Sequence, residues 1–215
     1  MRRKQSIKNR DGGNTARRKL RIIGGTWRGR TLVFPDLEGL RPTPDRVRET
    51  LFNWLVAHIT GSRCLDLFAG SGALGLEALS RGAARCDFVE RHRLAAETIE
   101  QHIRQLDAAD RSRVAVVDAS DFISRSRPID SGHDQSGPFD IVFIDPPFAD
   151  ALVAGITQQL IAADCLKQGS LVYIEQSTKT AEADLDQRLA LLRQKRAGEV
   201  DYRLYQFDNS GSLSD

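Results

Sequence analysis

The chain has 215 residues and 40% hydrophobic content, which is enough to bury one core of ordinary size but not two full domains. Its 31 Lys and Arg residues nearly balance 29 Asp and Glu residues, and no apolar run approaches the roughly 18 residues of a membrane span. Cys64, Cys86 and Cys165 are far apart and form no C-x-x-C motif, which argues against disulfides and a zinc site. We expect a cytoplasmic protein with one main domain and no bound metal.

Positive charge is concentrated at the start of the chain. Residues 1–48 contain 14 Lys and Arg residues but 4 Asp and Glu residues, whereas the remaining 167 residues contain 17 and 25. Clustered positive charge attracts a polyphosphate backbone, because each neutralised phosphate releases counterions. Nucleic acid is therefore the expected partner. The basic arm over residues 1–19 is equally consistent with a flexible segment that only aids solubility.

The first predicted elements are two short strands, Leu20–Ile23 and Thr31–Phe34, which flank a glycine-rich turn and form a hairpin. With the loop that follows, they make an extension over residues 20–42. Thr43 then supplies an N-cap, and the proline after it suits the first turn of a helix. One face of that helix carries Val47, Leu51, Trp54, Leu55 and His58. The helix should therefore pack on the main domain.

From residue 63 onward, short apolar strands alternate with amphipathic stretches of helix length, which is typical of a parallel sheet covered by helices. This pattern predicts an α/β main domain over residues 43–208, with a tail over residues 209–215. The predicted strands are Arg63–Leu67, Arg85–Val89, Arg113–Val117, Phe139–Ile144, Ser170–Glu175, Leu189–Gln194 and Val200–Phe207. The predicted helices are Ala73–Arg81, Leu94–Leu106 and Asp150–Ala163.

Four successive strands end in an acidic residue, namely Asp66, Glu90, Asp118 and Asp145. The carboxyl ends of parallel strands lie on one edge of a sheet, so these side chains should converge on one crevice. A single acid after a strand is more often a helix N-cap. Four acids in register indicate a binding site instead.

A glycine-rich turn follows Asp66 directly, at a place where a ligand can approach the backbone closely. Gly70, Gly72 and Gly75 satisfy the G-x-G-x-x-G pattern of dinucleotide-binding proteins, and Glu90 lies 20 residues after Gly70. Asp66 would repel a pyrophosphate but attract the cationic amino and sulfonium groups of S-adenosylmethionine. We therefore predict S-adenosylmethionine as the cofactor, with a nicotinamide dinucleotide as the alternative.

Carboxylate acceptors suit the polar groups of that cofactor. Glu90 can accept both ribose hydroxyls, and Asp118 can accept the adenine amino group. The predicted cofactor-binding residues are Asp66, Phe68, Ala69, Gly70, Gly72, Glu90, Arg91, Asp118 and Ala119.

The fourth strand ends in Asp145, Pro146, Pro147 and Phe148, which we predict to be the catalytic residues. Two prolines fix the backbone and leave the acceptors of Asp145 and Pro146 facing the crevice. A flat heterocycle could stack on Phe148 while its amino group donates to those acceptors. The alternative is a proline turn in front of a core phenylalanine.

Methyl transfer from a sulfonium needs an in-line nucleophile more than a strong base, and it needs no metal. Asp145 either takes the proton of the amine or only orients the amine. A base inside a stack cannot be reached, so a substrate base must be unpaired or flipped out.

The chain resembles the bacterial 16S ribosomal RNA guanine-N2 methyltransferases, the RsmD-like family, over about residues 20–177. The glycine-rich and D-P-P-F motifs occur in many amino-methyltransferases, and the block from Arg41 to Leu55 narrows the likeness to this family. The motifs that carry it are R-I-I-G-G at 21–25, W-R-G-R at 27–30, R-P-T at 41–43, R-V-R-E-T-L-F-N-W-L at 46–55, L-D-L-F-A-G-S-G-A-L-G at 65–75 and D-P-P-F at 145–148.

This resemblance implies a class I S-adenosylmethionine-dependent methyltransferase fold with a seven-stranded, mostly parallel sheet. It also implies a guanine of 16S ribosomal RNA, naked or in the assembling small subunit, as the substrate; we expect a monomer. Under that interpretation Arg28, Arg30, Arg41, Arg46 and Arg48 are candidate phosphate contacts. The chain departs from the family at His92, where Asp is usual, and at His102, where Asn is usual, which puts local cofactor contacts in doubt.

Three alternative functions remain open from the sequence. An enzyme of the same fold could methylate adenine in DNA or a glutamine side chain. A nicotinamide-dependent oxidoreductase could use the literal G-x-G-x-x-G motif. A non-catalytic RNA-binding protein could retain the fold without transferring a methyl group.

Overall fold

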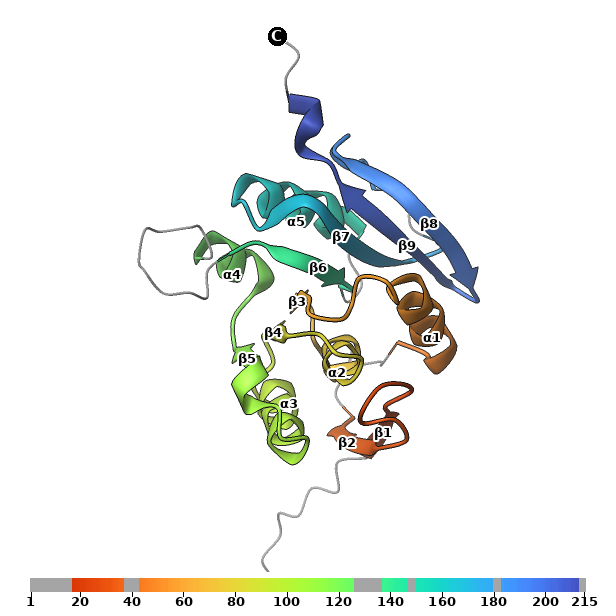
Figure 1. Ribbon diagram of the computed structural model, residues 1–215, viewed down its shortest axis with the longest axis vertical. Helices are drawn as coiled ribbons and strands as arrows, with labels where there is room; N and C mark the ends of the chain where they lie inside the picture. Colours follow the sequence, from red (N-terminus) through yellow and green to blue (C-terminus); the bar gives the residue numbers. More distant parts are fainter. Residues whose placement is uncertain (1–16, 37–42, 126–136, 147–149, 180–182, 213–215) are drawn as a thin grey trace, which may run out of the picture.

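A computed structural model describes residues 17–36, 43–125, 137–146, 150–179 and 183–212 (Figure 1). Its centre is a seven-stranded sheet in the order β5-β4-β3-β6-β7-β9-β8. The first five strands in that order, from β5 through β4, β3 and β6 to β7, are parallel. Strand β9 runs antiparallel to both of its neighbours, β7 and β8. The strands are β3 (Arg63–Asp66), β4 (Arg85–Val89), β5 (Ser112–Ala115), β6 (Phe139–Ile144), β7 (Leu166–Ser177), β8 (Leu189–Ala197) and β9 (Val200–Phe207). The strand order reverses between β3 and β6, where an open parallel sheet places its ligand site.

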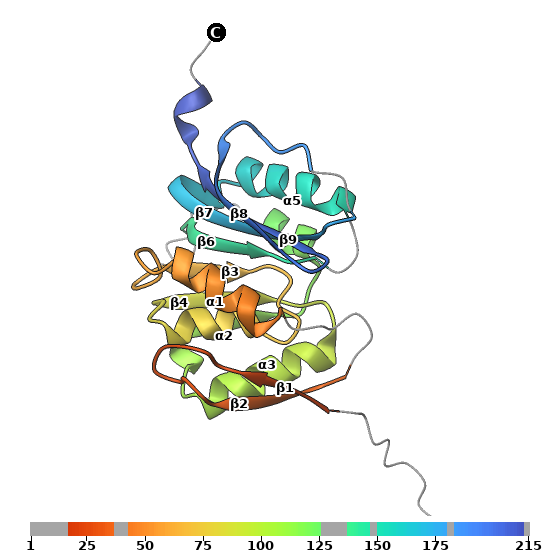
Figure 2. The same ribbon diagram turned by 90° about the vertical axis from the view of Figure 1, so that its right-hand side faces the viewer.

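Helices cover both faces of this sheet (Figure 2). Their bounds are α1 (Asp45–Trp54), α2 (Ala73–Ser80), α3 (Arg93–Gln105), α4 (Ala119–Arg125) and α5 (Asp150–Ala162). One buried cluster joins Leu51 of α1, Leu76 of α2 and Ile99 of α3 to one face of the sheet. A second cluster joins Phe122 of α4 and Ile156 of α5 to the other face. The two clusters therefore make the two helical layers around the sheet.

The strands and helices predicted for the main domain are present, with ends that differ by up to four residues. The largest difference is at β7, which begins at Leu166 because this residue pairs with Phe139 before a shift in register. Helix α4 was not predicted from the sequence. It is short, and the Asp118 carboxylate accepts a hydrogen bond from its Ser120 N–H at 2.9 Å.

The N-terminal hairpin consists of β1 (Arg17–Arg21) and β2 (Thr31–Pro35). Strand β1 begins at Arg17, which is three residues before the predicted start at Leu20 and inside the segment predicted as a basic arm over residues 1–19. Leu20 and Phe34 of the hairpin belong to the same buried cluster as helices α1 to α3. The hairpin is therefore part of the main hydrophobic core.

The loop of this hairpin is bonded to the end of α2. Glu77 accepts hydrogen bonds from the backbone N–H groups of Ile23 and Gly24, at 2.9 and 2.7 Å. The Thr26 N–H donates to the Ser80 carbonyl at 2.8 Å, which satisfies one of the last carbonyl groups of the helix. A side chain at Gly25 would lie 1.8 Å from that carbonyl oxygen, so the close approach requires glycine there.

At the C-terminal end, residues Asn209–Ser212 of the predicted tail form a short 3-10 helix. No helix in the described part of the chain is both long and apolar enough to cross a membrane.

Candidate active site

Three of the four predicted acids converge at the carboxyl edge of the sheet. Asp66 ends β3, Glu90 follows β4, and Asp145 follows β6; Asp66 and Glu90 are 3% and 7% exposed. Burial raises the pKa of Asp66 to about 7, and the charges of Asp145 and Glu90 add to that rise. Asp118 differs, because it lies three residues beyond the end of β5, is exposed and caps α4.

Two of these acids hold the glycine-rich turn in place. The Gly70 N–H donates to Glu90 Oε2 at 2.8 Å, and the His92 N–H donates to Oε1 of the same carboxylate at 2.7 Å. Asp66 Oδ2 accepts a hydrogen bond from the Gly75 N–H at 2.9 Å. The turn predicted to contact the cofactor is therefore fixed by the carboxylates that are also predicted to bind it.

The glycines of the turn serve two different purposes. Gly70 and Gly72 have φ angles of +53° and +77°, a left-handed conformation that favours glycine. Gly75 is needed for packing, since a Cβ there would lie 2.2 Å from the Phe88 ring on β4. The G-x-G-x-x-G pattern thus has a structural basis that does not depend on a pyrophosphate.

The electrostatics of this edge favour a cationic ligand. Burial raises the pKa of both Asp66 and Asp145, so their ionised forms are unfavourable unless positive charge approaches them. An amino group and a sulfonium supply that charge, whereas a pyrophosphate adds to the repulsion. These carboxyl groups therefore fit the predicted S-adenosylmethionine better than the nicotinamide dinucleotide.

The other predicted cofactor residues lie around the same turn and at the start of α4. Phe68 is partly buried and Ala69 is buried; the Ala69 N–H donates to the Val89 carbonyl at 2.9 Å. Ala119 is buried in the first turn of α4, and Arg91 is exposed. Their contacts with a cofactor stay predictions.

Asp145 and Pro146 follow β6 and are partly buried, while Pro147 and Phe148 lie outside the described residues. The Thr43 hydroxyl donates a hydrogen bond to Asp145 Oδ2 at 3.3 Å. Burial raises the pKa of Asp145 to about 6, and the Thr43 hydrogen bond opposes this rise. The predicted helix-capping role of Thr43 is wrong, because α1 has Pro44 at its N-cap position and no side-chain cap.

The prediction that Arg48 contacts phosphate is also wrong, because the residue is 0% exposed. Its guanidinium donates to Asp45 Oδ1 at 2.6 Å, to the Arg21 carbonyl at 2.9 Å and to the Thr43 carbonyl at 3.2 Å. It also pairs with the buried Glu77 carboxylate at 3.5 Å. Arg48 therefore connects α1 to α2 and to the hairpin. It also contacts Thr43, whose hydroxyl bonds to Asp145.

The roles of the remaining candidate phosphate contacts stay predictions. Arg28 and Arg30 are exposed at the bend of the hairpin, and Arg46 is exposed on the first turn of α1. Arg41 lies outside the described residues.

The two departures from the family pattern differ in their surroundings. His92 is exposed, and only its backbone N–H is bonded to Glu90. His102 is 3% exposed, and its Nε2 lies 3.0 Å from the Val33 carbonyl of β2. Burial lowers the pKa of His102, which favours the neutral imidazole. This histidine connects α3 to the hairpin.

Sequence analysis did not identify Glu175, which lies on β7 beside the end of β6. Ile144 pairs with Ile174 in the parallel register, so Asp145 and Glu175 are the next residues on neighbouring strands. Glu175 is 8% exposed and accepts a hydrogen bond from the Tyr173 hydroxyl at 2.8 Å. Its position near the end of the fifth predicted strand, after four strands that end in acids, is the signal that could have found it.

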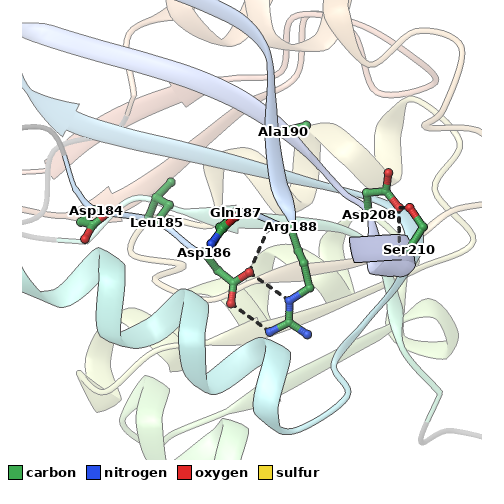
Figure 3. Close-up of a pocket in the computed structure, with 8 residues that line it drawn as sticks. All are labelled: Asp184, Leu185, Asp186, Gln187, Arg188, Ala190, Asp208 and Ser210. Carbon is green, nitrogen blue, oxygen red and sulfur yellow. Dashed lines mark hydrogen bonds and ion pairs between the residues drawn. The ribbon is translucent and has the colours of Figure 1, made fainter. Parts of the chain in front are cut away.

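A cavity of about 660 Å³ lies elsewhere, between the start of β8 and the end of β9 (Figure 3). Its polar groups are satisfied locally: Arg188 pairs with Asp186 at 2.9 Å, and the Ser210 N–H donates to Asp208 at 2.9 Å. Gln206 of β9 pairs with Leu171 of β7, so this cavity lies toward the amino edge of the sheet, away from Asp145. Over the described part of the chain, no group of three or more His, Cys, Asp or Glu side chains could hold a metal ion.

Comparison with known proteins identifies the family. Residues 20–206 match the family model described as Conserved hypothetical protein 95. Ribosomal RNA small subunit methyltransferase D of Escherichia coli (strain K12) is 42% identical over 193 residues, which cover 90% of this chain and 92% of that protein. The protein of the same name from Haemophilus influenzae is 41% identical over 191 residues, which cover 89% of this chain and 95% of that protein.

A solved structure agrees with these relatives. The putative methyltransferase yhhF from Escherichia coli superposes with a TM-score of 0.77 at 41% identity, over 88% of this chain and 98% of that one. The sheet order and the two helical layers are those of the class I, Rossmann-like methyltransferase fold. The chain therefore belongs to the Conserved hypothetical protein 95 family, that of the RsmD-like methyltransferases.

Proposed function

We propose that this protein is an S-adenosylmethionine-dependent methyltransferase that modifies the exocyclic N2 amine of a guanine in 16S ribosomal RNA of the small subunit. The observation that carries the proposal is the position of Asp145 and Pro146 at the carboxyl edge of the sheet, where Asp66, Glu90 and the glycine-rich turn also lie. The names of the relatives, which are ribosomal RNA small subunit methyltransferases, support the RNA substrate. We also propose that the protein acts as a monomer in the cytoplasm, where the small subunit that contains this RNA is assembled.

Bound in this crevice, S-adenosylmethionine supplies a methyl group activated by its sulfonium. The buried Asp66 carboxylate attracts the positive charge of the ligand, and Gly70 and Gly72 let the backbone approach it closely. Glu90 accepts hydrogen bonds from two backbone N–H groups and retains lone pairs for the ribose hydroxyls. Asp118 caps α4 and retains acceptor capacity for the adenine amino group.

The substrate amine is held from the other side of the crevice. The Asp145 carboxylate and the Pro146 carbonyl accept the two N–H groups of the amine, which leaves its lone pair free for the methyl carbon. Thr43 fixes one oxygen of Asp145 and leaves the other for the substrate. Positioning of this kind lowers the barrier without a metal or a strong base.

The exposed arginines supply the RNA contacts in this proposal. Arg28 and Arg30 project from the hairpin, and Arg46 lies three residues from Thr43, which bonds to Asp145. Phosphate contacts of this kind fix the orientation of the RNA without reading its sequence. The hairpin is joined to the core through Glu77, so RNA held by the hairpin has a fixed position relative to the crevice.

Transfer of a labelled methyl group tests the proposal. Purified protein is incubated with labelled S-adenosylmethionine and with small-subunit particles, or their naked RNA, from cells that lack the protein, and the labelled nucleosides are identified. N2-methylguanosine in 16S RNA is the expected product. Another labelled nucleoside would contradict the guanine assignment, and label in DNA or protein alone would contradict the RNA substrate.

A further inference from the structure

A buried pair of side chains, Tyr173 and Glu175, lies next to Asp145 and has no part in the functions assigned above. The parallel register pairs Ile144 with Ile174, which places Asp145 and Glu175 side by side at the carboxyl edge. The rings of Phe143 and Tyr173, two residues earlier on the same strands, have centroids 6.4 Å apart. Residues two apart on a strand share a face, so Glu175 lies on the same side of the sheet as Tyr173, and the charge of Asp145 acts on it there.

The Glu175 carboxyl is held in one orientation. The Tyr173 hydroxyl donates to its Oε2 at 2.8 Å, and only 8% of the residue is exposed. Among the described residues, its Oε1 atom has no hydrogen-bond partner. This oxygen therefore keeps its capacity to accept a hydrogen bond from a ligand.

The two neighbouring acids together make an unusual receptor for a base. Burial raises the pKa of Glu175 well above its usual value, and the charge of Asp145 raises it further. Two N–H donors presented side by side would satisfy both carboxyl groups at once and relieve this repulsion. The arrangement therefore matches a planar ring with two adjacent donors.

Guanine has such an edge, because its N1–H lies next to its N2 amino group. Adenine has an amino group next to N1, but this N1 is an acceptor and would face Glu175 with no proton between them. If Asp145 holds the exocyclic amine, the second acid reads the neighbouring ring nitrogen. A site that hydrogen-bonds a substrate N–H rejects an analogue without that group, because the buried acceptor is then left unpaired.

We propose that Glu175, oriented by Tyr173, accepts a hydrogen bond from guanine N1–H and selects guanine over bases that lack this donor. This inference rests on the proposed guanine-N2 activity and names the residue that gives that activity its specificity.

The test replaces one guanine with 2-aminopurine, which keeps the N2 amine but has no N1–H. The methyl-transfer experiment above first identifies the nucleotide that is methylated. A short RNA containing that position is then synthesised with either guanosine or 2-aminopurine there. Single-turnover rates and apparent KM are measured for both RNAs. Wild-type protein should prefer guanosine by roughly tenfold or more, the effect of losing one hydrogen bond to a charged group.

The Glu175→Gln variant should lose this preference, with the two RNAs methylated within about threefold of each other, because its amide can donate to N1 of 2-aminopurine. Tyr173→Phe keeps the ring and should reduce the preference to an intermediate value. Glu199→Gln, which changes an exposed acid that is paired with Lys179, should leave the preference unchanged. Thermal-shift titration with S-adenosylmethionine checks that each variant is folded.

An unchanged preference in both Glu175→Gln and Tyr173→Phe, with transfer to both RNAs lowered equally, would overturn the inference. If Glu175→Gln does not fold, the Tyr173→Phe result alone decides. Failure of wild-type protein to methylate N2 of the guanosine RNA would instead refute the proposed function, so the two failures are distinguishable.

Discussion

The Thr43 hydroxyl donates a hydrogen bond to the Asp145 carboxylate across 102 residues of sequence, at 3.3 Å. This contact joins the segment before α1 to the end of β6. The Thr43 carbonyl in turn accepts a hydrogen bond from the buried Arg48. The block from Arg41 to Leu55, which carries the family likeness, thus reaches the predicted catalytic residue directly.

Removing the Thr43 hydroxyl should slow methyl transfer and move its pH dependence. Thr43→Val keeps the shape of the side chain but loses the hydrogen bond, and we expect transfer to slow about 3- to 10-fold. This hydrogen bond lowers the pKa of Asp145, so its loss should move the acidic limb of the pH–rate profile from about 6 to higher pH. Single-turnover rates across pH measure both effects.

Thr50→Val is the matched control, because the Thr50 hydroxyl donates only to the Arg46 carbonyl of its own helix. It should change neither the rate nor the position of the limb. If the limb stays in place in Thr43→Val, the contact with Asp145 has no functional role.

Loss of Arg48 should destabilise the fold far more than loss of its exposed neighbour. Arg48→Met leaves the 0% exposed Glu77 carboxylate without this cation, and breaking a buried pair costs about 3–5 kcal/mol. Arg46→Met, on the exposed face of α1, should change the free energy of unfolding by less than about 0.5 kcal/mol. Urea unfolding of both variants gives the comparison, and equal losses would show that the buried network is not stabilising.

Replacing Asp66 should make the protein without cofactor less sensitive to pH. Burial raises the pKa of Asp66 from 3.8 to about 7, so the folded state binds this proton more tightly than the unfolded state does. The resulting contribution to stability is therefore present at low pH and is lost as the pH rises from about 4 to about 7. Asp66→Asn stays neutral and can still accept from the Gly75 N–H, so it avoids this loss.

We compare the free energy of unfolding of Asp66→Asn with that of the wild-type protein. Between about pH 4 and about pH 8, this difference should shift toward greater relative stability of the variant by up to ~4 kcal/mol. The same variant should bind S-adenosylmethionine more weakly, since it lacks the charge that attracts the ligand. Urea unfolding at the two pH values and calorimetric titration measure the two effects. If the difference in stability does not change with pH, the pKa of Asp66 is not raised in the folded protein.

Neutralising the hairpin arginines should weaken RNA binding in a salt-dependent way. The double variant Arg28→Gln and Arg30→Gln should reduce the slope of log K against log salt by about 1.4 to 1.8, because each phosphate contact contributes about 0.7 to 0.9. Arg113→Gln, at an exposed position of edge strand β5, is the control and should not change the slope. Filter binding at several salt concentrations measures it, and equal slopes for all three proteins would exclude the hairpin from the RNA interface.

Much of the fold could be predicted from the sequence because its signals are local. Strands of four to six apolar residues, amphipathic helices and acids after strands are all visible in short windows. The convergence of Asp66, Glu90 and Asp145 follows from the geometry of a parallel sheet alone. The start of β7 was misplaced, because it depends on pairing with Phe139 on another strand.

The burial of Arg48 could have been recognised, since it shares a helical face with Leu51, Phe52 and Leu55 at spacings of three, four and seven residues. Its buried partner Glu77 could not, because the pair forms only when α1 and α2 pack together. The same holds for Thr43, whose short-range pattern indicated a helix cap while a tertiary contact uses its hydroxyl. Local patterns identify elements, and long-range hydrogen bonds decide which polar residues serve the site.

The most direct test of the account is whether cofactor binding and methyl transfer separate at Asp145. Calorimetric titration with S-adenosylmethionine and single-turnover transfer to small-subunit RNA are measured for wild-type protein and Asp145→Ala. Because Asp145 holds the base rather than the cofactor, affinity for the cofactor should stay within about fivefold, or ~1 kcal/mol, while transfer falls by about 100-fold or more. Loss of cofactor binding with little further loss of transfer at saturating cofactor would contradict the account.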